Sequence, residues 1–74
     1  MAYEYQTEAG TLSLLRIGQR WAIAFNGRQR CQWLSPDTAA RAASRHKTGL
    51  TSWDHAQVTV SDDVMRWRPL GESL

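Results

Sequence analysis

The sequence has a single cysteine, Cys31, so the chain forms no internal disulfide. Small secreted domains that cannot build a large core depend on several disulfides, and the cysteine count argues against that class. Residues 1–8 have neither a basic start nor an apolar stretch, which argues against an ordinary signal peptide. No apolar run approaches the roughly 20 residues of a membrane-spanning helix. We therefore expect a cytoplasmic protein without a membrane partner.

The chain also has little net charge. Nine basic and seven acidic residues give a formal charge of +2. Residues 1–53 carry seven basic and three acidic residues, or +4, whereas residues 54–74 carry two and four, or −2. This mild basic bias is compatible with an anionic partner, but it is far weaker than the charge of a dedicated nucleic-acid binder.

Spacings typical of metal or catalytic sites are missing as well. The candidate metal ligands are Cys31, His46, Asp54 and His55. They show neither the CxxC nor the HxxxH spacing of known metal sites. Cys31 and His46 would make a nucleophile and base only if the thiol were accessible, and we expect it to be buried and inert. Asp62 and Asp63 could be interpreted as a catalytic pair of acids, but capping of a helical turn explains them more simply. We predict no enzyme activity, no catalytic residue, no metal and no cofactor.

What the chain does contain fits one small α+β domain over residues 1–74. Residues 1–10 predict an arm or short strand with Tyr3 and Tyr5 on one side. Residues 11–34 predict a three-stranded antiparallel meander, with strands over 11–17, 21–25 and 28–34. Asn26-Gly27 joins the last two strands, because both residue types tolerate the positive φ of a tight hairpin turn.

Two registers of this hairpin remain open. A two-residue loop places Phe25 opposite Arg28, so that the bulky face also carries two arginines. A bulge at Gly27 instead groups Gln29, Cys31 and Trp33 with the core, and turns the arginines outward. We favour the bulged register because arginines in a core face are costly without partners.

A helix follows over residues 35–47. Ser35 is a good cap, Pro36 suits the first helical position, and Asp37 meets the positive end of the helix dipole. Its alanines and one face of the His46 ring are expected to pack on the sheet. Residues 48–70 predict a wrapped tail, with a turn at 51–54, a β-like run at 58–60 and a capped turn at 61–67 that Pro69 stops. Residues 71–74 are expected to fray.

Two resemblances add expectations. Residues 20–67 resemble a group of small uncharacterised bacterial proteins that share the following landmarks. These are the Asn26-Gly27 hairpin, the Ser-Pro-Asp-Thr-Ala-Ala helix, Thr48-Gly49, Trp53-Asp54, Asp62-Asp63-Val64 and Trp67. The resemblance implies a bacterial source and a shared fold but no activity. Residues 11–46 are more loosely similar in layout to plant AP2-type domains and the arm-binding domains of phage integrases, which lay the exposed sheet face into DNA.

Two functional hypotheses follow from these observations. The first is a small accessory or protein-interaction module of a bacterium, with Trp53 and Trp67 as contact residues for an unknown protein partner or for self-association. Burial of both rings in the core is the alternative we favour for these tryptophans. The second hypothesis is a nucleic-acid-binding module that uses a sheet face with Arg20, Arg28 and Arg30. A merely solvated face, or pairing with the acidic tail, would remove its basis.

Overall fold

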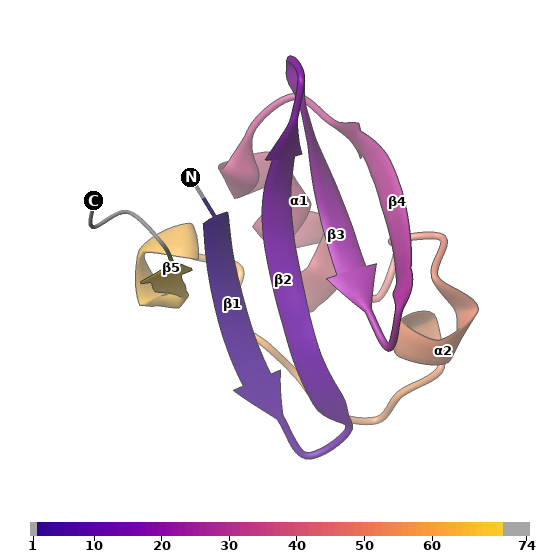
Figure 1. Cartoon of the computed structure of the whole chain (residues 1–74). Coiled ribbons are helices and arrows are strands. Elements are labelled where there is room, and N and C mark those ends of the chain that lie inside the picture. Colours follow the sequence, from indigo (N-terminus) through magenta and orange to yellow (C-terminus); the bar gives the residue numbers. More distant parts are fainter. Residues whose placement is uncertain (1, 71–74) are drawn as a thin grey trace.

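A computed structural model describes residues 2–70 and confirms an α+β fold with an antiparallel sheet (Figure 1). Its strands are β1 (Ala2–Thr7), β2 (Gly10–Ile17), β3 (Arg20–Phe25), β4 (Arg28–Trp33) and β5 (Arg68–Leu70). The helical elements are α1 (Pro36–Ser44), α2 (Thr51–Asp54) and a 3-10 turn, η1 (Val64–Arg66). In space the strands follow the order β4-β3-β2-β1-β5. Within residues 2–70 no helix is long and apolar enough to cross a membrane.

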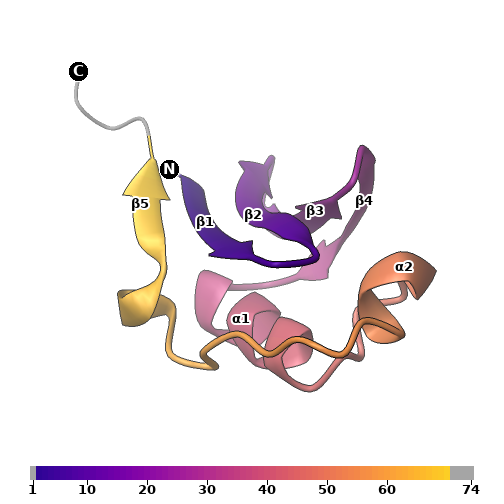
Figure 2. The same ribbon diagram turned by 90° about the horizontal axis from the view of Figure 1, so that it is seen from below.

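The molecule has two layers. Figure 2 shows α1 and the segment that leads from α2 to β5 on one side of the sheet, and the other side open. The core residues of β2 and β3 face the covered side, where they lie in register with Tyr3 and Tyr5 of β1. An antiparallel sheet with one packed and one solvated face gives this two-layer arrangement its single core.

The sheet has five strands, and the prediction of three is therefore wrong. Residues 2–7, for which the sequence predicts an arm or a short strand, pair with β2 along their whole length and form a strand. After η1 the chain returns to pair with β1 as β5. Pro69 lies inside β5, because an edge strand tolerates a residue that has no N–H to donate. The expected β-like run at 58–60 forms no strand.

The β3–β4 hairpin turns on two residues, and the favoured bulge at Gly27 is absent. Asn26 and Gly27 have φ values of +53° and +80°, as a type I′ turn requires. Phe25 is therefore opposite Arg28, and the same register continues to Arg30. Both arginines lie on the helix-covered side of the sheet. The cost that argued against this register is avoided because β4 is the outermost strand and both residues are exposed.

A bulge does occur, at the other end of the hairpin. Trp21 pairs with Trp33 and Ala22 pairs with Cys31, which leaves Gln32 as an extra residue in β4. The extra residue brings Trp33 to the same side as Trp21, and both rings are buried. The prediction that Trp33 joins the core is therefore correct, although the bulge that places it there is at Gln32 and not at Gly27.

Helix α1 begins as predicted. The Ser35 hydroxyl accepts a hydrogen bond from the backbone N–H of Thr38 at 3.2 Å, and the Thr38 hydroxyl accepts from the N–H of Ser35 at 3.3 Å. This capping box fixes the first turn. The helix ends at Ser44, ahead of the predicted end, and His46 beyond it has a φ of +57°. The side chains that α1 buries are small: Ala39, Ala40 and Ala43.

Tryptophans of the tail complete the core. Trp53 and Trp67 are 0% and 1% exposed. Each indole N–H reaches a backbone carbonyl at 2.9 Å, that of Ala43 for Trp53 and that of Ser61 for Trp67. Since a buried indole needs such a partner, these bonds let the tail dock large rings without an unsatisfied donor.

Candidate partner-binding edge

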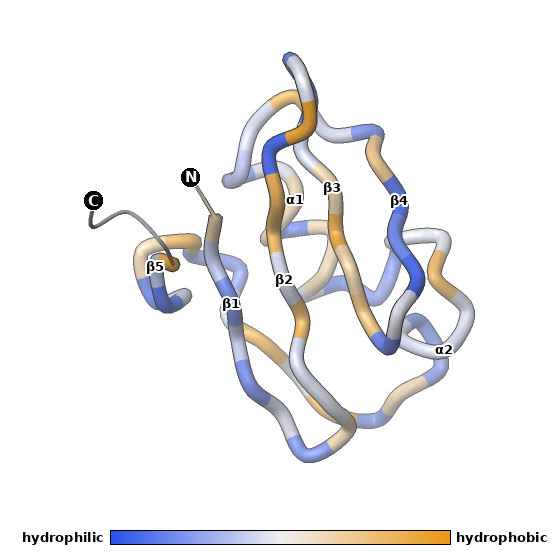
Figure 3. Tube along the Cα trace, viewed as in Figure 1, coloured by the Kyte–Doolittle hydropathy of each residue, from blue (hydrophilic) through white to orange (hydrophobic). Residues whose placement is uncertain are grey.

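Strand β4 forms one free edge of the sheet. It is six residues long and pairs only with β3 among the described strands. Figure 3 shows that β4 is largely hydrophilic, unlike the apolar stretches of β2 and β3 beside it. Residues 28–32 are exposed. We call this strand margin the β4 edge.

The register determines which backbone groups the β4 edge offers. In a two-residue hairpin the residues that flank the turn exchange hydrogen bonds, and hydrogen-bonded pairs then alternate along the strands. The backbone groups of Arg28 and Arg30 therefore bond to β3. The N–H and C=O groups of Gln29 and Cys31 point the other way, towards solvent. They are the backbone groups that a further strand would use.

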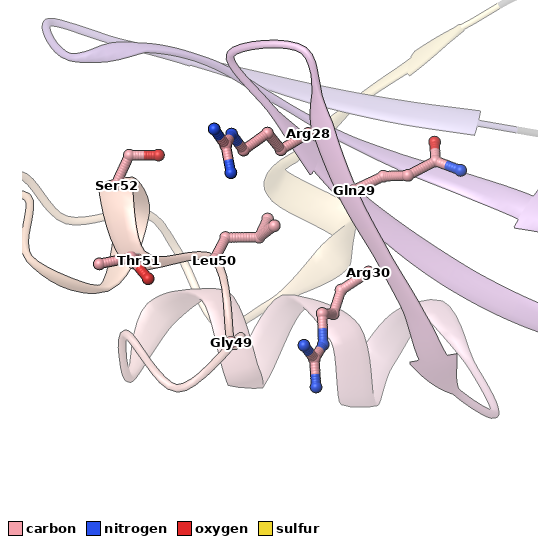
Figure 4. A pocket seen from close by; sticks show the side chains of 7 residues that line it. All are labelled: Arg28, Gln29, Arg30, Gly49, Leu50, Thr51 and Ser52. Carbon is pink, nitrogen blue, oxygen red and sulfur yellow. The ribbon is translucent and has the colours of Figure 1, made fainter.

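A hollow of about 720 Å³ lies beside this edge. Its lining residues are Arg28, Gln29, Arg30, Gly49, Leu50, Thr51 and Ser52. Figure 4 shows the arginine side chains of β4 reaching across to the residues that begin α2, while Gln29 points the opposite way. Neither arginine forms an ion pair or hydrogen bond with another described residue. We call this space the arginine hollow.

Asp54 holds the opposite wall of the arginine hollow in place. Its carboxylate accepts hydrogen bonds from the N–H and hydroxyl of Thr48, at 2.9 and 2.7 Å, and from the N–H of Gly49 at 2.9 Å. Burial alone would raise the pKa of Asp54. The hydrogen bonds from Thr48 and Gly49, with the nearby His46, outweigh burial and hold that pKa below its ordinary value.

Gly49 lets Arg30 lie close to this wall. The glycine has a φ of +86°, and a Cβ built there would be 3.0 Å from the Nε of Arg30. The guanidinium therefore packs directly over the glycine backbone. The sequence offers no signal for this contact, because it joins residues 19 positions apart through the path of the tail.

The arginines named from the sequence do not share one face. Arg28 and Arg30 lie on the covered side at the β4 edge, whereas Arg20 belongs with Ala22 and Ala24 on the open side. The predicted basic sheet face is therefore not formed. Asp54, in the acidic tail that is the alternative partner of the arginines, is bonded instead to the loop that follows α1. Thr51 and Ser52, which the sequence places only in the turn at 51–54, line the hollow, and α2 begins without a side-chain cap.

The other candidate residues are placed differently from what the patterns suggest. Cys31 is exposed on the open side, so the expectation of a buried thiol is wrong. His46 stacks on Trp53 with ring centroids 4.7 Å apart, and its Nδ1 is 2.9 Å from the Trp53 carbonyl oxygen. Trp53 and Trp67 are too deeply buried to contact a partner. Within residues 2–70 no three His, Cys, Asp or Glu side chains are grouped for a metal ion.

The open side of the sheet carries one apolar row. Leu70, Ala2, Leu15, Ala22 and Cys31 lie in register across the five strands. No described element covers this row (Figure 2). Antiparallel sheets commonly leave one face to water, and the row has no charge pattern that specifies an occupant. We assign it no partner.

Comparisons with known proteins add no relative: no family model, curated protein or solved structure matches the chain. The resemblances to small bacterial proteins and to DNA-binding three-stranded domains stay predictions.

Proposed function

We propose that this chain is a small, non-enzymatic protein-interaction module that binds an extended segment of a partner along the β4 edge. The observation that carries this proposal is the free row of backbone groups at Gln29 and Cys31. An extended segment that joins such an edge gains main-chain hydrogen bonds, and adjacent pockets then select its side chains. The arginine hollow supplies such a pocket beside the same edge.

The nucleic-acid hypothesis receives less support from the geometry. Its three arginines are divided between the two sides of the sheet, and Glu4 shares the open side with Arg20. Duplex recognition needs several cations on one continuous surface to offset counterions along the phosphate backbone. The β4 edge instead combines two cations with unpaired backbone groups. A polypeptide can hydrogen-bond to those backbone groups and place side chains beside the cations.

The test is a nuclear magnetic resonance titration of the ¹⁵N-labelled full chain. The probes are short peptides of threonine alternating with serine, glutamate or lysine. We expect at least one peptide to shift the amide signals of β4. In the free protein the amide hydrogens of Gln29 and Cys31 should exchange rapidly, and in the complex they should exchange slowly, because a new strand protects them.

A matched pair of variants separates backbone pairing from other contacts. Cys31→Pro removes the outward N–H, and edge strands tolerate proline at such a position. Cys31→Ala keeps the N–H and changes only the side chain. We expect binding to be lost in the first variant and kept in the second. Absence of binding by every peptide at millimolar concentration, or equal binding by both variants, would contradict the proposal.

A further inference from the structure

The charges beside the free edge indicate what kind of segment it takes. We propose that the β4 edge selects an acidic segment, whose carboxylate side chains enter the arginine hollow. This inference rests on the proposed function and names the chemistry of the partner.

The spacing of the arginines matches the side-chain period of a strand. Arg28 and Arg30 are two residues apart on one side of β4, which corresponds to about 6.6 Å along the strand. A segment paired with the β4 edge has the same period, so its alternate side chains face both arginines in turn. Cross-strand pairs of opposite charge are favourable, and like charges are unfavourable.

The two guanidinium groups have unused hydrogen-bonding capacity. Neither has a partner among residues 2–70, and the nearby carboxylate of Asp54 is occupied by Thr48 and Gly49. Arginine binds carboxylates through two parallel hydrogen bonds. Ser52 lies across the hollow from Arg28, and its hydroxyl is a further donor at the same place (Figure 4).

The same charges disfavour a second copy of the chain as the occupant. Two β4 strands paired edge to edge would bring four arginines into one narrow region with no described acid between them. Repulsion of the wrong partner is a common source of specificity. The β4 edge therefore repels the β4 edge of a second copy, while it can still bind an acidic strand.

The test measures fluorescence anisotropy of the labelled serine, glutamate and lysine peptides with the full chain at low and moderate salt. We expect the glutamate peptide to bind roughly five- to tenfold more tightly than the serine peptide, and the lysine peptide to bind more weakly still. Salt should reduce this preference because the pairs are exposed to solvent.

Variants identify the cations responsible. Arg28→Gln/Arg30→Gln should remove the preference for glutamate, so that the glutamate and serine peptides bind with equal affinity. Arg16→Gln/Arg20→Gln makes the same change of net charge away from the edge and should keep the preference. Arg28→Glu/Arg30→Glu should favour the lysine peptide instead. This reversal of charge also excludes loss of folding as the cause of a lost preference.

Each alternative outcome has a distinct meaning. Equal binding of the three peptides overturns the acidic partner but leaves the β4 edge as a binding site. Absence of binding by all three overturns the proposed function itself. A labelled DNA duplex that binds more tightly than the glutamate peptide, and loses binding in Arg28→Gln/Arg30→Gln, overturns both in favour of nucleic acid.

Discussion

Gly49 and Arg30 form the contact on which the shape of the arginine hollow depends. The glycine serves two needs at this point. Its φ of +86° lies where side chains with a Cβ are strained, and the missing Cβ leaves room for the guanidinium of Arg30. A side chain at position 49 would push the guanidinium of Arg30 away from the loop, and Arg30 would then no longer line the hollow.

We predict that Gly49→Ala destabilises the fold more than Gly18→Ala. Gly18 also has a positive φ, of +63°, but a Cβ there meets nothing within 4 Å. Both variants should pay about 1–2 kcal/mol for the left-handed backbone. Gly49→Ala should lose about 0.5 kcal/mol more, because the new methyl displaces the flexible end of the exposed Arg30 side chain. Urea unfolding measures both changes.

Repeating the comparison in an Arg30→Ala background isolates the contact. The extra cost at Gly49 should then disappear, because the side chain that the new methyl meets is gone. An extra cost that persists without Arg30 would place its origin in the backbone alone.

Among the elements, α2 depends on Asp54 for its position. Three hydrogen bonds to one carboxylate tie the loop after α1 to the four-residue helix, which is too short to be stable alone. Because the folded state lowers the pKa of Asp54, its contribution to stability is present above the ordinary value of 3.8. It is lost as the pH falls through the lower pKa of the folded protein.

We therefore predict that Asp54→Asn lowers the free energy of unfolding by about 1–2 kcal/mol at neutral pH. The difference from the parent chain should narrow as the pH falls below 3.8, since protonation removes the same charge. Asp62→Asn is the control, because Asp62 is exposed and bonds to no described residue. Urea titrations across this pH range measure both. A difference independent of pH would show that the charge of Asp54 contributes nothing.

Elements with local signals are the ones that the sequence predicts. Ser35-Pro36 starts α1 and Asn26-Gly27 turns the hairpin, because the determining groups are neighbours in the chain. Strand β5 has no such signal, since it has three residues and its pairing partner β1 lies at the other end of the described chain. The prediction of the hairpin register was wrong for another reason. The favoured register requires every residue of the bulky face to be buried, but an edge strand lets arginine reach water from that face.

The candidate site is predictable only in part, because some of its residues have local sequence signals and others are brought there by long-range packing. The sequence draws attention to Arg28 and Arg30, and the two-residue turn, which is the less favoured of the two predicted registers, places them on the covered side. Thr51 and Ser52 join them only because the tail passes under β4. That path depends on the docking of Trp53, which is a long-range packing event without a local sequence signal.

At the scale of the whole molecule, an open sheet must keep its two edges from pairing with other copies. The edge formed by β5 is short and contains Pro69, which removes one N–H donor. The edge formed by β4 is longer, so it depends on charge and on the bulge at Gln32 for its protection. The two arginines thus have a role in the free protein as well as in the proposed complex.

We predict that Arg28→Thr/Arg30→Thr makes the chain self-associate. Threonine favours strands and removes the repulsion between two β4 edges, so that the free backbone groups of Gln29 and Cys31 can pair between copies. Sedimentation equilibrium should show dimers whose population grows with concentration. Arg16→Thr/Arg20→Thr reaches the same net charge at two other strand positions and should stay in the oligomeric state of the parent chain. Equal association of both variants would point to net charge rather than to the edge. No association of either would mean that the bulge alone protects β4.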